Sequence, residues 1–254
     1  MHNAIRSLVL VLSILFIAAG QASAQEISPM PVSGKITYEV FRGEDGMQLG
    51  QAEHQWTQNS GRYSMTLDVR TTGVIAVLYR LQYTQQSVGS LGAQGLIPDH
   101  FVVDQKGRKR EESIFDWRNK TVSIRRGGEE RRNKPIDPGD QDLLSTWHQI
   151  AYADPGRLPY SYTVVTAKNT KEVILEFLGN EDILLPIGKI PARRMRASAE
   201  DGSMRIEIWL ARNEALLPVR VNLLTDKGEV LDLKATGLQY EMPAGQWHSF
   251  SEKY

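Results

Sequence analysis

The sequence of 254 residues contains no cysteine. This absence excludes disulfides, thiolate metal sites and a cysteine nucleophile, and it also excludes lipid attachment at a leader cysteine. An exported chain of this composition depends on its hydrophobic core and its hydrogen bonds. Its length is sufficient for that, because a chain of this size buries roughly 70–75% of its unfolded surface on folding.

An excess of either charge sign is also missing, because 30 basic residues are balanced by 30 acidic ones. A general nucleic-acid binder needs a basic face that replaces counterions, so we expect no nucleic-acid partner. The same balance gives no strong attraction to an anionic membrane surface. Loss of a leader that holds Arg6 and no acid would change the net charge from zero to −1.

The first 24 residues have the pattern of a cleavable secretory signal peptide. A short charged start ends at Arg6, an apolar run covers residues 7–20, and Ala22-Ser-Ala24 supplies the small residues that a signal peptidase recognises. An uncleaved anchor is the alternative, but the run is shorter than the about 20 residues of a membrane span. We expect cleavage before Gln25, a periplasmic location and a mature chain, residues 25–254, that does not span the membrane.

Alternation of apolar and polar residues dominates the mature chain. In segment 63–69 every second residue is apolar, which predicts a strand with one buried and one wet face. Similar strands are expected over residues 35–41, 52–56, 80–87, 98–104, 112–117, 121–125, 160–166, 172–178, 193–199, 204–210, 218–224 and 230–238. Short polar turns between them are typical of hairpins. We therefore expect a mainly β fold, a curved antiparallel meander that forms an open or closed β-barrel.

One segment, residues 142–152, places its apolar side chains at helical spacing. Asp140 or Asp142 can cap its start, and Asp154-Pro-Gly156 ends it. Segment 74–79 is a compact apolar run whose periodicity fits a helical turn or a buried strand equally well.

The charged loop 125–139 is the only plausible seam between two halves of the chain. Strands continue on both sides of it with the same character, and the apolar stripe of the helix needs a sheet to cover. We therefore expect a single β-rich domain, residues 25–254, with one short packed helix.

No arrangement of residues predicts catalysis or metal binding. The five histidines lack metal-ligand spacing. Three carboxylates within Asp137–Asp142 form an oxygen-rich group of the kind that calcium prefers, but a turn and a helix cap explain the same acids. Ser145 lacks the Gly-x-Ser-x-Gly elbow that exposes a nucleophile. We expect no metal, no cofactor, no catalytic residue and no enzymatic activity.

Six short motifs follow one another along the mature chain. They are Gly95-Leu-Ile-Pro98, Ser113-Ile-Phe-Asp-Trp117, Asp140-Gln-Asp-Leu-Leu-Ser145, Leu185-Pro-Ile-Gly188, Ile208-Trp-Leu-Ala211 and Leu217-Pro-Val-Arg220. Their order, over roughly residues 34–240, resembles the bacterial exported domain-of-unknown-function family 3108. The resemblance implies a periplasmic protein of Gram-negative bacteria and supplies no activity or catalytic residue. A weaker likeness is to the curved sheets of periplasmic lipoprotein carriers, where a helix plugs an open barrel, which is an analogy of fold alone.

An incompletely closed barrel can enclose an apolar cavity. Trp56, Leu67, Trp117 and Trp147 either line such a cavity or form a packed core. Our first hypothesis is a non-enzymatic protein that binds an apolar ligand, such as a lipid, or an envelope protein. The alternatives are an interaction module for an envelope protein or peptidoglycan, and an envelope-polymer hydrolase, which needs two carboxyls about 5–9.5 Å apart. The sequence leaves the ligand, the closure of the sheet and the oligomeric state open.

Overall fold

The computed structural model describes residues 30–44, 46–73, 76, 82–224, 228–243 and 247–251. The predicted signal peptide lies outside these residues, as does all of the apolar run 74–79 except residue 76. Both remain predictions.

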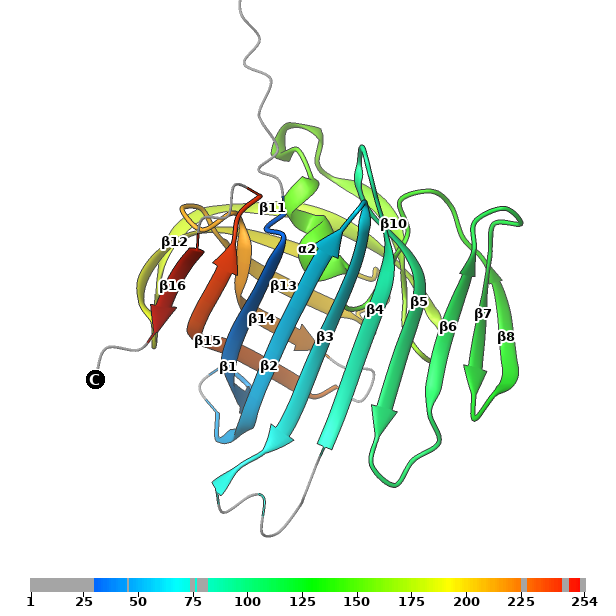
Figure 1. Cartoon of the computed structure of the whole chain (residues 1–254), viewed down its shortest axis with the longest axis horizontal. Helices are drawn as coiled ribbons and strands as arrows, with labels where there is room; N and C mark the ends of the chain where they lie inside the picture. Colours follow the sequence, from blue (N-terminus) through cyan, green and yellow to red (C-terminus); the bar gives the residue numbers. More distant parts are fainter. Residues whose placement is uncertain are drawn as a thin grey trace, which may run out of the picture.

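Within the described residues, sixteen strands form one curved sheet (Figure 1). In chain order they are β1 (Ser33–Arg42), β2 (Gln48–Asn59), β3 (Arg62–Thr71), β4 (Gln82–Gly92), β5 (Gly95–Gln105), β6 (Glu111–Asp116), β7 (Thr121–Arg126), β8 (Glu129–Pro135), β9 (Gln141–Asp142), β10 (Tyr160–Val165), β11 (Thr170–Leu185), β12 (Gly188–Ser198), β13 (Arg205–Ala211), β14 (Leu217–Leu224), β15 (Val230–Glu241) and β16 (Trp247–Ser251). The predicted antiparallel meander is confirmed.

The spatial order of the strands is β8 to β1, then β15 down to β9, with β16 added beside β15. The described strands pair in antiparallel fashion, apart from the short β9, which runs parallel to β10. Because β1 pairs with both β2 and β15, the first and last parts of the domain meet in the middle of the sheet.

The ladder of paired strands in the described residues does not close into a ring, but side chains join its β9 end to strands β4 and β5. Gln141 Nε2 on β9 donates to the carbonyl of Leu96 on β5 at 2.9 Å, and Ser87 Oγ on β4 donates to Asp142 Oδ2 at 2.5 Å. These bonds bring the β9 end of the sheet against β4 and β5, although no backbone ladder joins them in the described chain. The result is a barrel-like body with a side-chain seam.

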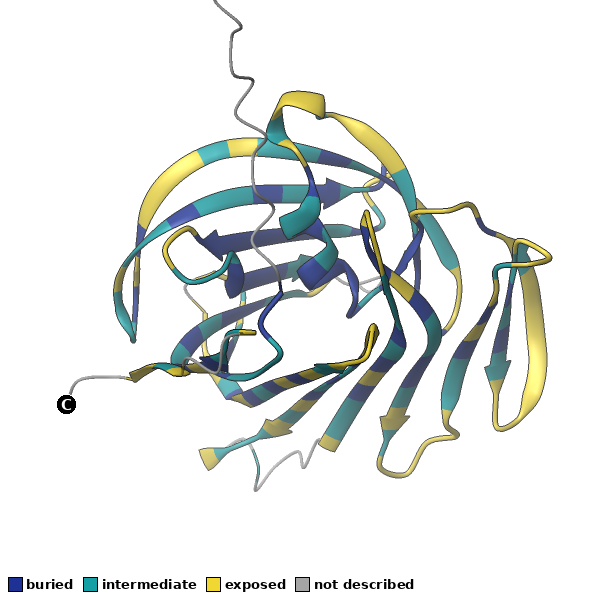
Figure 2. Ribbon diagram, turned by 45° about the horizontal axis from the view of Figure 1, so that its top comes forward, coloured by how far each residue is buried: buried dark blue, intermediate teal, exposed yellow. Residues whose placement is uncertain are grey.

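Strands β6 to β8 continue past this seam and project from the body as a wing (Figure 1). The outermost strand, β8, is exposed at nearly every position and carries the sequence EERRNKP (Figure 2). Charged edge strands resist pairing with a second chain. We predicted a loop over residues 125–139, which was wrong for this strand, because a solvated edge strand carries no apolar alternation.

The plug is the segment from Asp142 to Ala153, which lies inside the curve of the sheet (Figure 1). It contains α2 (Thr146–Gln149) and the 3-10 turn η1 (Ile150–Tyr152). The expected helix over 142–152 therefore begins four residues later than predicted. Its start is delayed because the hydroxyls of Ser145 and Thr146 bond back to the Asp142 carbonyl, and Asp142 itself pairs in β9.

The two acids expected as helix caps have other partners. Asp142 Oδ1 accepts the backbone N–H of Leu144 and of Ser145, in the turn before the helix. Asp140 accepts the N–H of Asp137 and of Thr163, so it fixes a loop to β10. These two acids thus hold turns and strands in place.

Candidate functional site

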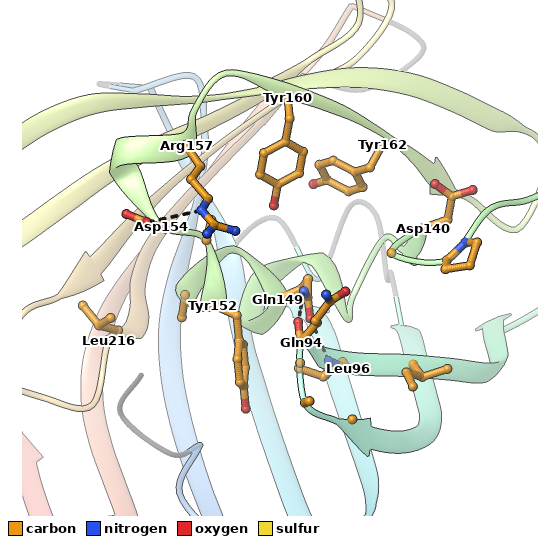
Figure 3. A pocket seen from close by; sticks show the side chains of 18 of the residues that line it. Gln94, Leu96, Asp140, Gln149, Tyr152, Asp154, Arg157, Tyr160, Tyr162 and Leu216 are labelled. Atoms are coloured by element: carbon orange, nitrogen blue, oxygen red, sulfur yellow. Dashed lines mark hydrogen bonds and ion pairs between the residues drawn. The ribbon is translucent and has the colours of Figure 1, made fainter. Parts of the chain in front are cut away.

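A cleft of about 1250 Å³ opens at the rim of the barrel, beside the plug. We call it the rim cleft. Its walls are the β4–β5 hairpin, the loop at residues 138–140, residues 149–157 of the plug and the turn after it, β10, the middle of β12 and the β13–β14 turn (Figure 3). The cleft therefore lies where the plug, the seam and the rim of the barrel meet.

The β4–β5 hairpin is clipped to the plug by Gln149. Its Oε1 accepts the N–H of Leu96 at 2.7 Å, and its Nε2 donates to the carbonyl of Gln94 at 2.9 Å. Gly95 between them has φ +110°, and an added Cβ would lie 2.2 Å from Gln149 Oε1. Only glycine fits this position without moving the clip.

Apolar and aromatic side chains line the rim cleft from more than one side. Tyr160 and Tyr162 lie across the cleft from Leu96 (Figure 3), with their ring centroids 6.3 Å apart. Ile97 and Tyr160 are exposed to 39% and 41%, which is unusual for large apolar side chains inside a concavity. Binding of an apolar ligand to this surface is favourable, because it removes apolar area from contact with water.

Leu216 adds to the apolar wall from the β13–β14 turn. Its φ is +52°, and that of Ala215 before it is +48°. A positive φ is an outlier for a bulky residue, and such strain persists where the surrounding structure holds the chain. The turn therefore presents Leu216 to the cleft in a conformation that a free loop would not keep.

Three basic side chains also line the rim cleft, those of Arg157, Arg193 and Arg212. Arg157 forms a loose ion pair with Asp154 at 3.8 Å. Arg193 and Arg212 form neither an ion pair nor a side-chain hydrogen bond with another described residue. Burial lowers the pKa of Arg193, the charge of Arg212 lowers it further, and Asp154 acts in the opposite direction. We call these two residues the arginine pair.

The two acids that line the cleft are already engaged. Asp140 is 5% exposed and accepts two backbone N–H groups, although burial raises its pKa. Asp154 accepts the N–H of Gly156 and pairs with Arg157. The acids of the cleft therefore leave most of the positive charge of the arginine pair unneutralised.

The four residues predicted to line a cavity lie in two places. Trp56, Leu67 and Trp147 belong to the core and are at most 4% exposed. Trp117 is half-buried, stacks on Phe115 at 5.5 Å and lines the rim cleft. The structure does not bring the four together on one accessible surface.

A histidine pair lies in the core beside Trp147. His54 Nδ1 is 2.8 Å from the carbonyl of Thr66 and must donate to it, so Nε2 of the neutral ring is an acceptor. His148 Nε2, 2.8 Å away, donates to that atom. Burial lowers the pKa of His54 to about 4, against the opposing effect of the Thr66 bond. Burial also holds the pKa of His148 well below its usual value, and the charge of His54 acts in the same direction.

Asp142 is the corresponding buried acid. Burial raises its pKa to about 6, although Ser87 and the N–H groups of Ser145 and Leu144 favour its charged form. In the part of the chain that the structure describes, no three His, Cys, Asp or Glu side chains gather into a possible metal site.

The sequence alone shows Arg193 with Arg194 as a short basic cluster, which favours a solvated turn over contact with a phosphate or lipid headgroup, and it does not pair Arg193 with Arg212. Arg193 shares the inward face of β12 with Met195 and Ala197, which are fully buried. A cation within a buried period-two row was the available signal. Arg212 carried no such signal, because it follows the last residue of β13.

Among the described residues, no helix combines the length and the apolar character needed to cross a bilayer. No curated protein sequence matches the chain.

Three solved structures are similar in part. A β-barrel-like protein of domain-of-unknown-function family DUF1849 from Brucella abortus has a TM-score of 0.57 at 12% identity, covering 83% of this chain and 98% of that one. A lipoprotein candidate from Parabacteroides distasonis has a TM-score of 0.32 at 10% identity, covering 84% and 97%. An exported-protein candidate with a YmcC-like fold from Bacteroides fragilis has a TM-score of 0.30 at 14% identity, covering 80% and 93%. The first likeness supports the barrel-like fold alone.

The sequence itself places the chain more firmly than these likenesses do. The family model described as "Protein of unknown function (DUF3108)" matches residues 35–235, which is most of the chain, and the protein belongs to this family.

Proposed function

We propose that the chain is an exported, non-enzymatic protein of the periplasm that binds an apolar ligand, such as the acyl chain of an envelope lipid, in the rim cleft. The observation that carries this proposal is a cleft of about 1250 Å³ with large apolar and aromatic side chains left exposed in it. Pockets that hold drug-sized ligands are about 300–1,000 Å³. The rim cleft has room for a ligand of at least that size.

Of the four residues predicted to line a ligand cavity, we propose Trp117 as the direct contact. Its Nε1–H donates to the carbonyl of Pro98 at 2.7 Å, so the indole is held with its polar atom satisfied. Trp56, Leu67 and Trp147 would act indirectly, by packing the core that fixes the plug. Export to the periplasm rests on the leader pattern, which ends at Ala24.

A hydrolase receives less support from the same cleft. Its two acids, Asp140 and Asp154, already accept backbone N–H groups. A catalytic pair needs one carboxyl free to protonate the leaving group and one free to attack or to activate water. Binding is the function that the cleft supports best.

An interaction module is the second candidate, and β16 favours it. Trp247 and Phe250 on this strand are 66% and 41% exposed. Aromatic side chains are enriched at contacts with other proteins. Replacing both by serine should then abolish capture of an envelope partner and leave lipid content unchanged.

The proposal is tested by native mass spectrometry, with lipid extraction, on the protein purified from a bacterial periplasm. We expect a lipid at close to stoichiometric amount. Ile97→Glu places a charge on an exposed apolar wall of the cleft and should remove the lipid. Leu184→Glu is the matched control, since Leu184 is 83% exposed and lies outside the cleft. A lipid-free protein that stays lipid-free after incubation with envelope lipids would overturn the proposal.

A further inference from the structure

The strand register brings the arginine pair together. Ala192 on antiparallel β12 pairs with Ala211 on β13, so Arg193 lies opposite Leu210 and Arg212 continues beside Pro191. Arg193 and Arg212 are therefore diagonal neighbours on the same face, within reach of long side chains, and the charge of Arg212 acts on Arg193. The N–H of Arg212 bonds to the carbonyl of Pro191 at 2.9 Å, which fixes its backbone there. Two like charges are thus held close together by the main chain.

Such an arrangement is unfavourable in the empty protein. Two guanidinium groups repel each other, and partial burial of Arg193 removes water that would screen the repulsion. Other arginines of β12 have acids on the neighbouring strands, since Arg194 pairs with Glu207 and Arg196 pairs with Glu176. The arginine pair has no such carboxylate within ion-pair distance in the described residues. An anionic ligand would relieve this repulsion.

The geometry of guanidinium groups defines the anion. Each presents a planar fork of N–H donors that matches a phosphate or carboxylate with two hydrogen bonds. The apolar wall formed by Ile97, Trp117 and Leu216 belongs to the same cleft. One molecule that satisfies both surfaces has an apolar chain joined to an anionic group.

We propose that the ligand of the rim cleft is an anionic amphiphile, whose phosphate or carboxylate binds Arg193 and Arg212 while its acyl chain lies against Ile97, Trp117 and Leu216. This assignment rests on the proposed function and adds the chemical class of the ligand. Arg157, which already pairs with Asp154, borders the same site and has a secondary part in it.

The test compares two probes that differ only in the phosphate, 1-oleoyl-lysophosphatidate and 1-oleoylglycerol, with inorganic phosphate as a third. Affinity is measured by calorimetry below the critical micelle concentration of each lipid. We expect lysophosphatidate to bind about ten-fold or more tightly than oleoylglycerol, because charge-assisted hydrogen bonds are the strong ones. Added salt should reduce this preference, since exposed charges are screened.

The double variant Arg193→Gln/Arg212→Gln should lose the preference and keep its affinity for oleoylglycerol, which also shows that the variant is folded. The matched control is Arg108→Gln, because Arg108 is exposed in a turn outside the cleft. It should behave as the wild type.

Each remaining outcome is decisive. Equal affinity for the two lipids in the wild type overturns the anionic assignment and leaves the proposed function standing. Failure of both lipids to bind overturns the proposed function itself. Phosphate that binds as tightly as lysophosphatidate would show a site for a free anion, and the amphiphile would then be the wrong ligand.

Discussion

Arg193 and Arg194 are neighbours on β12, yet they face opposite sides of the sheet and meet opposite conditions. On the outer face, Arg194 donates two hydrogen bonds to Glu207 Oε2, the shorter at 2.6 Å, and lies 4.9 Å from the centre of the Trp209 ring. On the inner face, Arg193 meets Arg212 and no carboxylate within ion-pair distance among the described residues. The charge of Arg194, on the outer face, is therefore neutralised by Glu207, whereas the charge of Arg193, in the cleft, is available to a ligand.

The outer face continues this pattern across several strands. Arg220 pairs with the fully buried Asp232 at 2.9 Å and lies 4.4 Å from the Trp209 ring centre. Trp209, only 3% exposed, therefore has a guanidinium from each of two neighbouring strands over its ring. Paired charges and cation–π contacts make this face a rigid support.

On the inner face, the buried polar groups that the structure describes are held by hydrogen bonds and not by ion pairs. His54 and His148 are neutral and bonded to each other, and Asp142 is surrounded by donors. Buried polar groups without charge partners are stable only when their hydrogen bonds are made. The arginine pair has no carboxylate within ion-pair distance among the described residues, and it lies where the inner face borders the cleft.

The largest expected effect is on the outer face. Asp232→Asn removes the buried carboxylate that accepts two hydrogen bonds from Arg220, so the free energy of unfolding should fall by about 3 kcal/mol in a urea titration. The control Asp182→Asn breaks an exposed pair with Lys189 and should lower it by about 0.5 kcal/mol or less. Equal losses would contradict the distinction between buried and exposed pairs.

A smaller effect concerns the clip of the cleft. Gly95→Ala forces an alanine to a positive φ and pushes against Gln149, so it should destabilise the protein by about 2 kcal/mol and weaken lipid binding. Gly107 also has a positive φ but nothing lies near its missing Cβ. Gly107→Ala should therefore destabilise by about 1 kcal/mol and leave binding intact. Thermal unfolding with lipid titration checks both.

Acid should act on the inner face. The pKa of His54 is lowered to about 4 in the folded protein, so the unfolded chain takes up protons first as the pH falls below about 6.5, and stability is lost. Asp142, whose pKa is raised to about 6, has the opposite sign. The effect of His54 is therefore isolated by comparing the change in unfolding free energy of the wild type with that of His54→Gln. Relative to His54→Gln, the wild type should lose on the order of 1 kcal/mol between pH 7 and pH 5.5.

Urea midpoints of both proteins at the two pH values give this difference. A wild type that gains stability relative to His54→Gln in acid would mean that His54 is charged in the folded state.

The smallest effect tests the opening comparison directly. Arg193→Gln removes a charge that Arg212 repels and that has no ion-pair partner among the described residues, so stability should change by less than about 0.5 kcal/mol. Arg194→Gln breaks the pair with Glu207 and should lower the free energy of unfolding by about 1 kcal/mol. If Arg193→Gln were the more destabilising change, the inner arginine would have a structural partner.

Much of the fold could be predicted because one buried face imposes a period of two. β3 shows this, with Tyr63, Met65 and Leu67 buried and the residues between them less so. The wing strand β8 was not predicted, because neither of its faces is covered and its sequence therefore has no apolar alternation. The start of the helix was predicted too early, because the hydroxyl groups of Ser145 and Thr146 donate to the backbone carbonyl of Asp142. The spacing of apolar residues gives no sign of such hydrogen bonds.

The candidate site was harder to predict, because it is built by pairing between distant residues. Trp117 could be selected as an inward aromatic, but the same reasoning selected three core residues with it. The arginine pair depends on the register of β12 with β13, and the clip depends on Gln149 reaching across to β5. Neither contact leaves a pattern within a single segment of sequence.

The most direct test of the account is photo-crosslinking of the periplasmic protein with a lysophosphatidate that carries a diazirine on its acyl chain, followed by peptide mapping. The account predicts labels on the β4–β5 hairpin near Ile97, on β10 near Tyr160, and on the turn at Leu216. Labels confined to the outer face of β12–β15, or to the exposed aromatic residues of β16, would contradict it.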